Sequence, residues 1–162
     1  MPAVSPNNAH RTRDVKMLLV KTTVKPSDIH GLGLFAAEFI GKGTCIWQLT
    51  HGFDLVVSRE AVEALPEPSQ IQMKKYSYVN METGLFIICM DDARYSNHSD
   101  MPNTWEIHHS KDSPERSIAL RDILPGEEIT CDYRTFDARW REKLGPHWPE
   151  LPRQRPRRAT AA

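Results

Sequence analysis

The stretch ARYSNHSDMPN, residues 93–103, is the most distinctive part of this 162-residue chain. It gathers polar side chains around a single proline, Pro102, and places a histidine between an asparagine and a serine. Adjacent residues of an extended chain point to opposite faces, so His98, Ser99 and Asp100 cannot form the hydrogen-bond relay of a catalytic triad. The run therefore indicates a turn or the wall of a pocket rather than a hydrolase site.

Two other stretches stand out at a distance from this run. IHGLGLFAAEFIGKG, residues 29–43, contains a Gly-Leu-Gly, which by itself is more typical of a turn with positive φ than of a ligand site. RDILPGEEITCDY, residues 121–133, places paired acids after a Pro-Gly turn. Alone, it is typical of a charged β-hairpin that ends in a buried tyrosine.

Together and in this order, the three stretches resemble the SET-domain family of protein lysine methyltransferases, over residues 20–145. The family's usual forms are arginine-aromatic-x-Asn-His-Ser-x-x-Pro-Asn and Gly-Glu-Glu-Leu-x-x-Asp-Tyr, and ARYSNHSDMPN and GEEITCDY match nearly every position. The resemblance implies a mostly β fold with short helices, in which small curved sheets surround a pseudoknot-like chain crossing. It also implies that S-adenosylmethionine binds on one face and that the target lysine enters from the other through a narrow channel.

The resemblance also implies roles for individual residues. The residues expected to bind the cofactor are His30, Gly31, Leu32, Gly33, Arg94, Asn97, His98 and Tyr133. Tyr133 matches the family's active-site tyrosine, and Tyr78 matches less distinctively a tyrosine of the lysine channel, so both are expected to be catalytic. Cys131 is expected to line the channel with Tyr78. Many members carry phenylalanine at that position, so the smaller side chain favours the addition of more than one methyl group.

The sequence departs from the family pattern in two further places. Asp100 stands where many members have cysteine, and no cysteine-rich segment follows Tyr133. The chain thus resembles small, stand-alone members without a zinc-binding segment. Phe136, Trp140 or Trp148, or a partner subunit, is then expected to cover the cofactor. The oligomeric state stays open, a homodimer included.

Bulk composition is that of one globular domain, with 40% hydrophobic residues, 26% charged residues and no net charge. We expect the domain to span residues 15–145, between a disordered tail at 1–14 and a disordered, Pro- and Arg-rich tail at 146–162. The arginines of the second tail lack interleaved aromatic residues, so a nucleic-acid partner is not expected. No apolar run approaches the roughly 20 residues that cross a bilayer, so no membrane partner is expected either.

The cysteines and histidines do not indicate a metal site. Cys45, Cys89 and Cys131 are odd in number and far apart, which predicts free thiols in a cytoplasmic protein. The histidines form no HxH or HxxxH pair, and a metal is therefore not expected. The predicted function is S-adenosylmethionine-dependent methyl transfer to the side-chain amine of lysine in a protein or peptide substrate. The alternative is a non-catalytic peptide-binding module on the same fold.

Local patterns predict where the strands and helices lie. Apolar and β-branched runs predict strands at 17–24, 31–37, 44–50, 84–90, 104–109, 116–123 and 127–133. Helices are expected at 59–65, capped by Ser58 and stopped by Pro66, and from Ser69 to Tyr76. A last helix is expected at 136–144, with Phe136 and Trp140 one turn apart on one face.

Overall fold

A computed structural model describes residues 17–107 and 114–145, so both predicted tails lie outside the described residues. The strands are β1 (Met17–Leu18), β2 (Thr22–Pro26), β3 (Leu32–Ala36), β4 (Cys45–Gln48), β5 (Leu55–Val57), β6 (Tyr78–Val79), β7 (Phe86–Ile88), β8 (Asn97–His98), β9 (Thr104–Ile107), β10 (Arg116–Ala119) and β11 (Thr130–Cys131). The helices are α1 (Arg59–Glu63), α2 (Glu67–Tyr76) and α3 (Trp140–Leu144), with 3₁₀ turns at Asp92–Tyr95 and Tyr133–Thr135.

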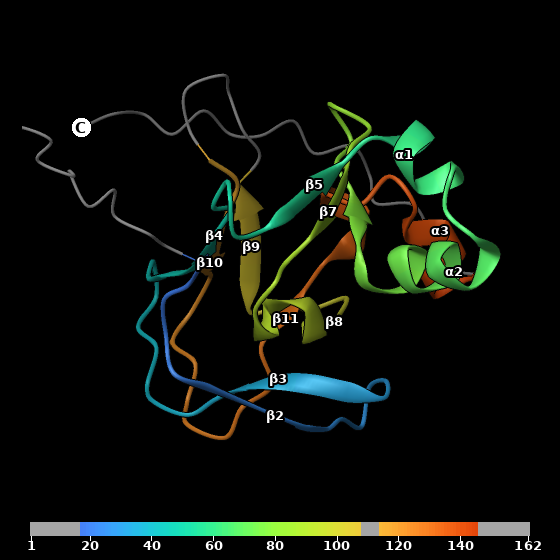
Figure 1. The fold of residues 1–162 in the computed structure, drawn as a ribbon. Helices are drawn as coiled ribbons and strands as arrows, with labels where there is room; N and C mark the ends of the chain where they lie inside the picture. Colours follow the sequence, from blue (N-terminus) through green and yellow to red (C-terminus); the bar gives the residue numbers. More distant parts are fainter. Residues whose placement is uncertain (1–16, 108–113, 146–162) are drawn as a thin grey trace, which may run out of the picture.

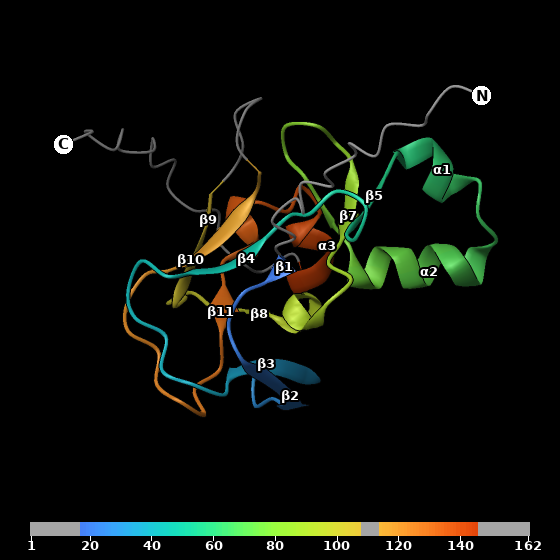
Figure 2. The same cartoon turned by 60° about the vertical axis from the view of Figure 1, so that its left-hand side comes forward.

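The strands form several small sheets rather than one continuous sheet. Their orders are β1-β4-β10-β9, β5-β7-β6, β2-β3 and β8-β11. Figure 1 shows β2 and β3 as a separate layer below β8 and β11. Figure 2 shows α1 and α2 at the opposite end from β9 and β10, with α3 between them. The predicted fold class, mostly β with short helices and small sheets, is confirmed.

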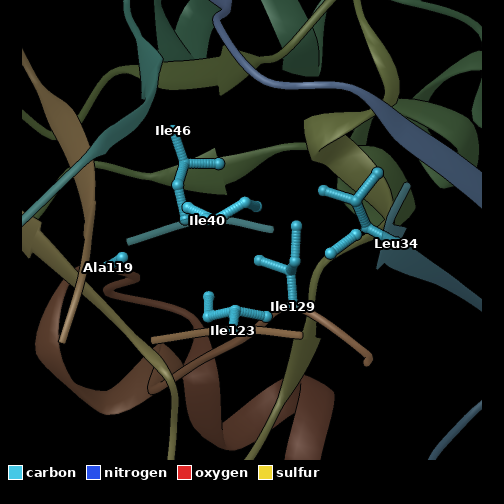
Figure 3. Close-up of a cluster of buried hydrophobic side chains, with 7 residues drawn as sticks. Leu34, Ile40, Ile46, Ala119, Ile123 and Ile129 are labelled. Atoms are coloured by element: carbon cyan, nitrogen blue, oxygen red, sulfur yellow. The ribbon is translucent and has the colours of Figure 1, made fainter. Parts of the chain in front are cut away.

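A buried apolar cluster joins sheets that are far apart in the sequence. Figure 3 shows Leu34, Ile40, Ile46, Ala119, Ile123 and Ile129 packed together. Each is at most 2% exposed, and full burial of such a side chain stabilises the folded state by roughly 1.5–3 kcal/mol. The cluster therefore fixes β3, β4 and β10 relative to the segment that leads into β11.

The pair β8 and β11 lies at the centre of this arrangement. The two strands are parallel, with Thr130 beside Asn97 and Cys131 beside His98. Next to them, Asn103 accepts a hydrogen bond from the Thr130 N–H at 2.8 Å and donates one to the Glu128 carbonyl at 2.7 Å. The two sequence stretches with the most distinctive motifs are thus held side by side.

Two expectations about strand pairing are wrong. Residues 17–24 do not form one strand, because β1 pairs with β4 and β2 pairs with β3 in a different sheet. The stretch 121–133 does not form the hairpin that it suggests when taken alone: Ile123 pairs with Ile40, and β11 pairs with β8. Pairing with distant strands buries the apolar faces of these segments, and local pairing would leave them exposed.

All three predicted helices form near their expected positions, but α2 and α3 differ from the prediction in where they begin. The Ser58 hydroxyl caps α1 by accepting the Ala61 N–H at 3.2 Å. Helix α2 begins at Glu67, two residues before the predicted start, because Pro68 is tolerated in the first turn of a helix. Phe136 lies outside α3 and ends the preceding 3₁₀ turn, so it does not share a helix face with Trp140. Within residues 17–107 and 114–145, no helix has the length and hydropathy to cross a membrane.

Candidate active site

A cavity of about 500 Å³ lies where the motifs meet. Seven of the predicted site residues line it: His30, Tyr78, Arg94, Asn97, His98, Cys131 and Tyr133. They come from four separate stretches of the chain, which the β8-β11 pair and the apolar cluster hold together. The remaining three predicted site residues, Gly31, Leu32 and Gly33, are not part of the cavity lining.

Asn97 attaches the glycine-containing loop to the rest of the site. Its side-chain amide donates to the carbonyls of His30 and Leu32, each at 3.1 Å, and to the Glu128 carboxylate at 2.8 Å. The same carboxylate accepts the Ser27 hydroxyl at 2.8 Å. Asn97 and Glu128 therefore bind the turn between β2 and β3 to the central strand pair. The role of Glu128 was not predicted, although it belongs to the quoted GEEITCDY motif.

The two glycines of the loop are required for different reasons. Gly31 has φ +53°, which favours glycine, and a Cβ added there would meet nothing within 4 Å. At Gly33 an added Cβ would lie 2.2 Å from a Glu128 carboxylate oxygen and 2.9 Å from the Ser27 Cβ. Gly33 thus makes room for Glu128, and its expected contact with the cofactor stays a prediction.

His98 is a buried imidazole that contacts Tyr133. It is 5% exposed, and its Nδ1 accepts the backbone N–H of Tyr133 at 3.2 Å. Burial lowers the pKa of His98, against the opposing effect of the Asp132 carboxylate 3.5 Å away. The neutral ring with an unprotonated Nδ1 is the form that can accept this hydrogen bond.

Tyr133 keeps its phenolic proton. Its hydroxyl donates to the Ser96 carbonyl at 2.8 Å, which fixes the direction of the O–H bond. Burial, followed by the proximity of Cys131 and Asp137, raises the pKa of Tyr133 above its usual value. The oxygen of Tyr133 therefore remains available as a hydrogen-bond acceptor, and the phenolate form is disfavoured.

Three aromatic rings form one wall of the cavity. Phe136 packs edge-on against Tyr78, with ring centroids 5.2 Å apart, and against Tyr133 at 5.9 Å. Phe136 thus lies at the site, as one of three candidates for covering it. Trp140 does not line the cavity, and Trp148 lies outside the described residues.

Helix α3 contributes Lys143 and Leu144 to the cavity lining. The Lys143 ammonium pairs with the buried Asp137 carboxylate at 2.8 Å and donates to the Ser77 carbonyl at 2.7 Å. It also lies 5.3 Å from the centre of the Tyr133 ring. These contacts attach α3 to the residues just before β6, and so close the site beside its two tyrosines.

The cysteines at the site are buried, protonated thiols. Cys131 is 4% exposed, and burial raises its pKa well above the usual value. Cys89 also lines the cavity, and burial raises the pKa of its thiol in the same way. Both are therefore poor nucleophiles and poor metal ligands. In the part of the chain that the structure describes, no three His, Cys, Asp or Glu side chains converge as metal ligands would.

Two acidic residues of the cavity were not predicted. Glu115 accepts the Tyr78 hydroxyl at 2.6 Å and the Asn80 side-chain amide at 2.5 Å. Glu106 lies on β9, and its carboxyl has a pKa raised to about 7 by burial and by Glu115. Residues 104–109 alternate between polar and apolar side chains, which is typical of an exposed strand on which Glu106 would be solvated. Only the pairing of β9 with β10, which sets Glu106 beside Ser117, brings it to the cavity.

Asp100, the departure from the family pattern, has a clear partner. Its carboxylate pairs with the Arg134 guanidinium at 2.7 Å, and Arg134 also contacts Asp132 at 2.8 Å. An acid at position 100 therefore adds a second carboxylate to an arginine that flanks Tyr133. The interaction links the stretch 93–103 to the residue that directly follows the stretch 121–133.

Comparisons with known proteins agree with this geometry. The family model of the SET domain matches residues 31–134. The histone-lysine N-methyltransferase SETMAR of Rattus norvegicus is 31% identical over 113 residues, which are 64% of this chain and 36% of the relative. The chain thus spans about a third of the length of this curated relative.

Solved structures resemble this chain in fold. A humanized Chaetomium thermophilum Polycomb Repressive Complex 2 bound to the inhibitor GSK343 aligns with a TM-score of 0.58 and 21% identity, covering 77% of this chain and 16% of the other. A candidate histone methyltransferase from Plasmodium falciparum aligns with a TM-score of 0.51 and 21% identity, covering 72% and 95%. The family model spans well over half of the sequence and ends one residue after Tyr133. This chain therefore belongs to the SET-domain family.

Proposed function

We propose that this protein is a protein-lysine N-methyltransferase that uses S-adenosylmethionine as the methyl donor. One observation carries the proposal: a single cavity is lined both by the expected donor-side residues His30, Asn97 and His98 and by the expected channel residues Tyr78 and Cys131. A direct methyl transfer requires donor and acceptor to meet in one enclosed space. Its family and its histone-lysine methyltransferase relative support the same reaction.

The dimensions and the walls of the cavity fit a ligand of this kind. A volume of about 500 Å³ lies within the usual range of roughly 300–1,000 Å³ for small-molecule sites. Gly31 faces open space, and Asn97 holds the backbone on both sides of it. His30, Arg94, Asn97 and His98 would hold the cofactor at this end. S-adenosylmethionine, when bound, supplies a methyl group activated by its attachment to a positively charged sulfur.

The aromatic wall suits the acceptor amine. Free lysine has a pKa of about 10.4, so nearly every lysine in water at pH 7 carries a proton and cannot attack. Removal from water between Tyr78, Phe136 and Tyr133 disfavours the charged amine. The rings also restrict the direction of approach, and well-oriented reactions of this kind gain roughly 7–11 kcal/mol.

Tyr133 orients the reacting groups through its oxygen. Because its own proton is donated to the Ser96 carbonyl, the oxygen lone pairs are free to accept from the amine or from the polarised methyl group. The buried Cys131 thiol beside it is smaller than the phenylalanine of many relatives. We propose that this space admits a methylated amine, so that more than one methyl group is added.

Methyl transfer from radiolabelled S-adenosylmethionine to core histones and to cell lysate tests the proposal, with labelled lysines located by mass spectrometry. We expect label on lysine, and a loss of about a hundredfold in rate for Tyr133→Phe. Calorimetric titration with S-adenosylmethionine distinguishes the alternative. A folded protein that binds peptides and does not bind this cofactor is a binding module, and that result would contradict the proposal.

A further inference from the structure

We propose that Tyr78 and Glu115 form a proton relay that removes the proton of the incoming lysine ammonium. The inference rests on the proposed function and assigns a step that its chemistry requires. Tyr78 is the group that touches the amine, and Glu115 is a positioning and proton-accepting residue that acts through Tyr78.

The relay is already connected by hydrogen bonds. The Tyr78 hydroxyl donates to one Glu115 oxygen at 2.6 Å, and the Asn80 side-chain amide donates to the other at 2.5 Å. Glu115 is 9% exposed, and Asn80 is 3% exposed. Asn80 in turn is held in a turn by the backbone N–H groups of Glu82 and Thr83. The carboxylate therefore has a fixed orientation toward the phenol.

The two tyrosines of the cavity differ in what accepts their protons. Tyr133 donates to a backbone carbonyl, which cannot take up a proton at neutral pH. Tyr78 donates to a carboxylate, which can. Both rings contact Phe136, so both phenols lie at the same aromatic wall. Only Tyr78 offers a path by which a proton can leave that wall for an ionisable acceptor among the described contacts.

Glu106 and Glu115 both lie at this end of the cavity. Glu106 faces Glu115 from β9, and burial together with the negative charge of Glu115 raises the pKa of the Glu106 carboxyl. Cys89 and Cys131, both protonated thiols, and Lys143 of α3 also line this cavity.

The transfer balances without any further reactant. The lysine ammonium loses a proton as its N–H bond breaks, and the electron pair stays on nitrogen. An O–H bond forms on Tyr78 while the original Tyr78 proton moves to Glu115. The neutral amine can then attack, and its methylated product is again an ammonium. Glu115 returns its proton to water, so one proton is released for each methyl group transferred.

The pH dependence of the turnover number, kcat, tests the relay. The acceptor is a pool of peptides with one central lysine in randomised flanks. At pH 7 we expect Glu115→Gln and Tyr78→Phe to lower kcat by about a hundredfold, a typical effect of losing a general base. As the pH rises to about 9.5, toward the pKa of lysine, water supplies the neutral amine and most of the deficit disappears.

A second acceptor and two controls separate the relay from a structural role. A peptide pool carrying S-(2-aminoethyl)cysteine, whose amine is less basic than that of lysine, is expected to reduce the deficit at pH 7. Glu63→Gln, an exposed acid on α1, is expected to behave as wild type at every pH. Thermal melting and calorimetry with S-adenosylmethionine verify that each variant folds and binds the cofactor.

Each outcome has a defined meaning. A deficit that shrinks with rising pH and with the less basic amine supports the relay. If the wild type is active and the variants show the same deficit at pH 7 and 9.5, the relay is wrong and the proposed function stands. If the wild type transfers methyl groups to no lysine, both proposals are overturned.

Discussion

Gly33 illustrates how one position can serve a site without touching its ligand. The residue lies in β3 against the Glu128 carboxylate, which receives hydrogen bonds from Ser27 and Asn97. Asn97 in turn donates hydrogen bonds to the His30 and Leu32 carbonyls and so holds the loop. The absence of a side chain at position 33 thus keeps Glu128 in place, and Glu128 keeps the loop at the cavity.

Gly33→Ala is expected to lower the free energy of unfolding by about 1–3 kcal/mol, as added volume in a packed region does. The new Cβ would lie within 3 Å of both Glu128 and Ser27, so Glu128 has to move away from Asn97. Urea denaturation measures the loss. Calorimetry with S-adenosylmethionine is expected to show weaker binding as well.

Gly41→Ala is the matched control, because a Cβ there meets Phe39 and Thr44 only at 3.8 and 3.9 Å. It should leave stability nearly unchanged. In a double-mutant cycle, Glu128→Ala should cost less in the Gly33→Ala background than in the wild type. Strictly additive effects of the two substitutions would show that the clash is not with Glu128.

Apart from Tyr78, the residues that line the cavity could be predicted from the sequence only inside the motifs. Asn97, His98 and Tyr133 belong to runs whose spacing is distinctive, and the structure brings all three to one cavity. Glu115 and Glu106 sit in ordinary alternating segments. Their position at the cavity depends on the pairing of β10 with β4 and β9, which no local pattern encodes.

At the scale of elements, Asn103 joins the two segments that carry the motifs. It is 1% exposed and bonds both the Thr130 N–H and the Glu128 carbonyl. Thr104 adds a hydrogen bond to the Thr130 carbonyl at 2.9 Å. Two-residue strands such as β8 and β11 cannot form a long ladder of backbone hydrogen bonds, and these side-chain contacts supply the missing interactions.

Asn103→Ala is therefore expected to lower the free energy of unfolding by about 3 kcal/mol, because it leaves buried backbone groups of Thr130 and Glu128 without partners. Urea denaturation with an unchanged m-value provides the measurement. Ser99→Ala removes an acceptor for the Met101 N–H in the same loop, where water can replace it, and should cost less than about 1 kcal/mol. Equal losses for the two variants would contradict the role given to Asn103.

Elements could be predicted well where the local signal was complete. Ser58 and the run after it were sufficient for α1, since a helix cap is a local interaction. The hairpin that residues 121–133 suggest when taken alone does not form, because Ile123 and β11 pair with residues far away in the sequence. The short strands β5, β6 and β8 were missed, since two or three residues carry no periodicity.

At the scale of the whole molecule, the carboxyl of Glu106, which lines the cavity, links stability to pH. Its pKa rises from 4.5 to about 7 on folding, mainly through burial. The folded state thus binds this proton more tightly than the unfolded state. Stability associated with this group is fully present below pH 4.5 and is lost as the pH rises through about 7.

Glu106→Gln removes this titration. Relative to the variant, the wild type should lose up to about 3 kcal/mol of unfolding free energy between pH 4.5 and 7, and no more above that. Parallel urea titrations of the two proteins from pH 4 to 8 measure the difference. A difference that does not vary with pH would place the Glu106 carboxyl in water.

The overall architecture followed from the family resemblance, and composition alone gave only one mostly β domain. The reason is physical: contacts such as those of Ile129 with Leu34 and Ile46 join residues that are far apart in the chain. Local preference cannot select among the many ways of pairing such short strands. The three motifs in a fixed order indicate the strand pairing because they identify the family, and the family's fold specifies which segments lie side by side.

The account depends on one cavity that connects the donor side to the acceptor side. A bisubstrate compound, in which an adenosyl group is linked through a short tether to an alkyl amine, tests this connection by calorimetry. We predict that it binds at least about a hundredfold more tightly than S-adenosylhomocysteine, because a linked second group adds its binding energy when both sites are within reach. Affinity no greater than that of S-adenosylhomocysteine would contradict a continuous passage between His98 and Tyr78.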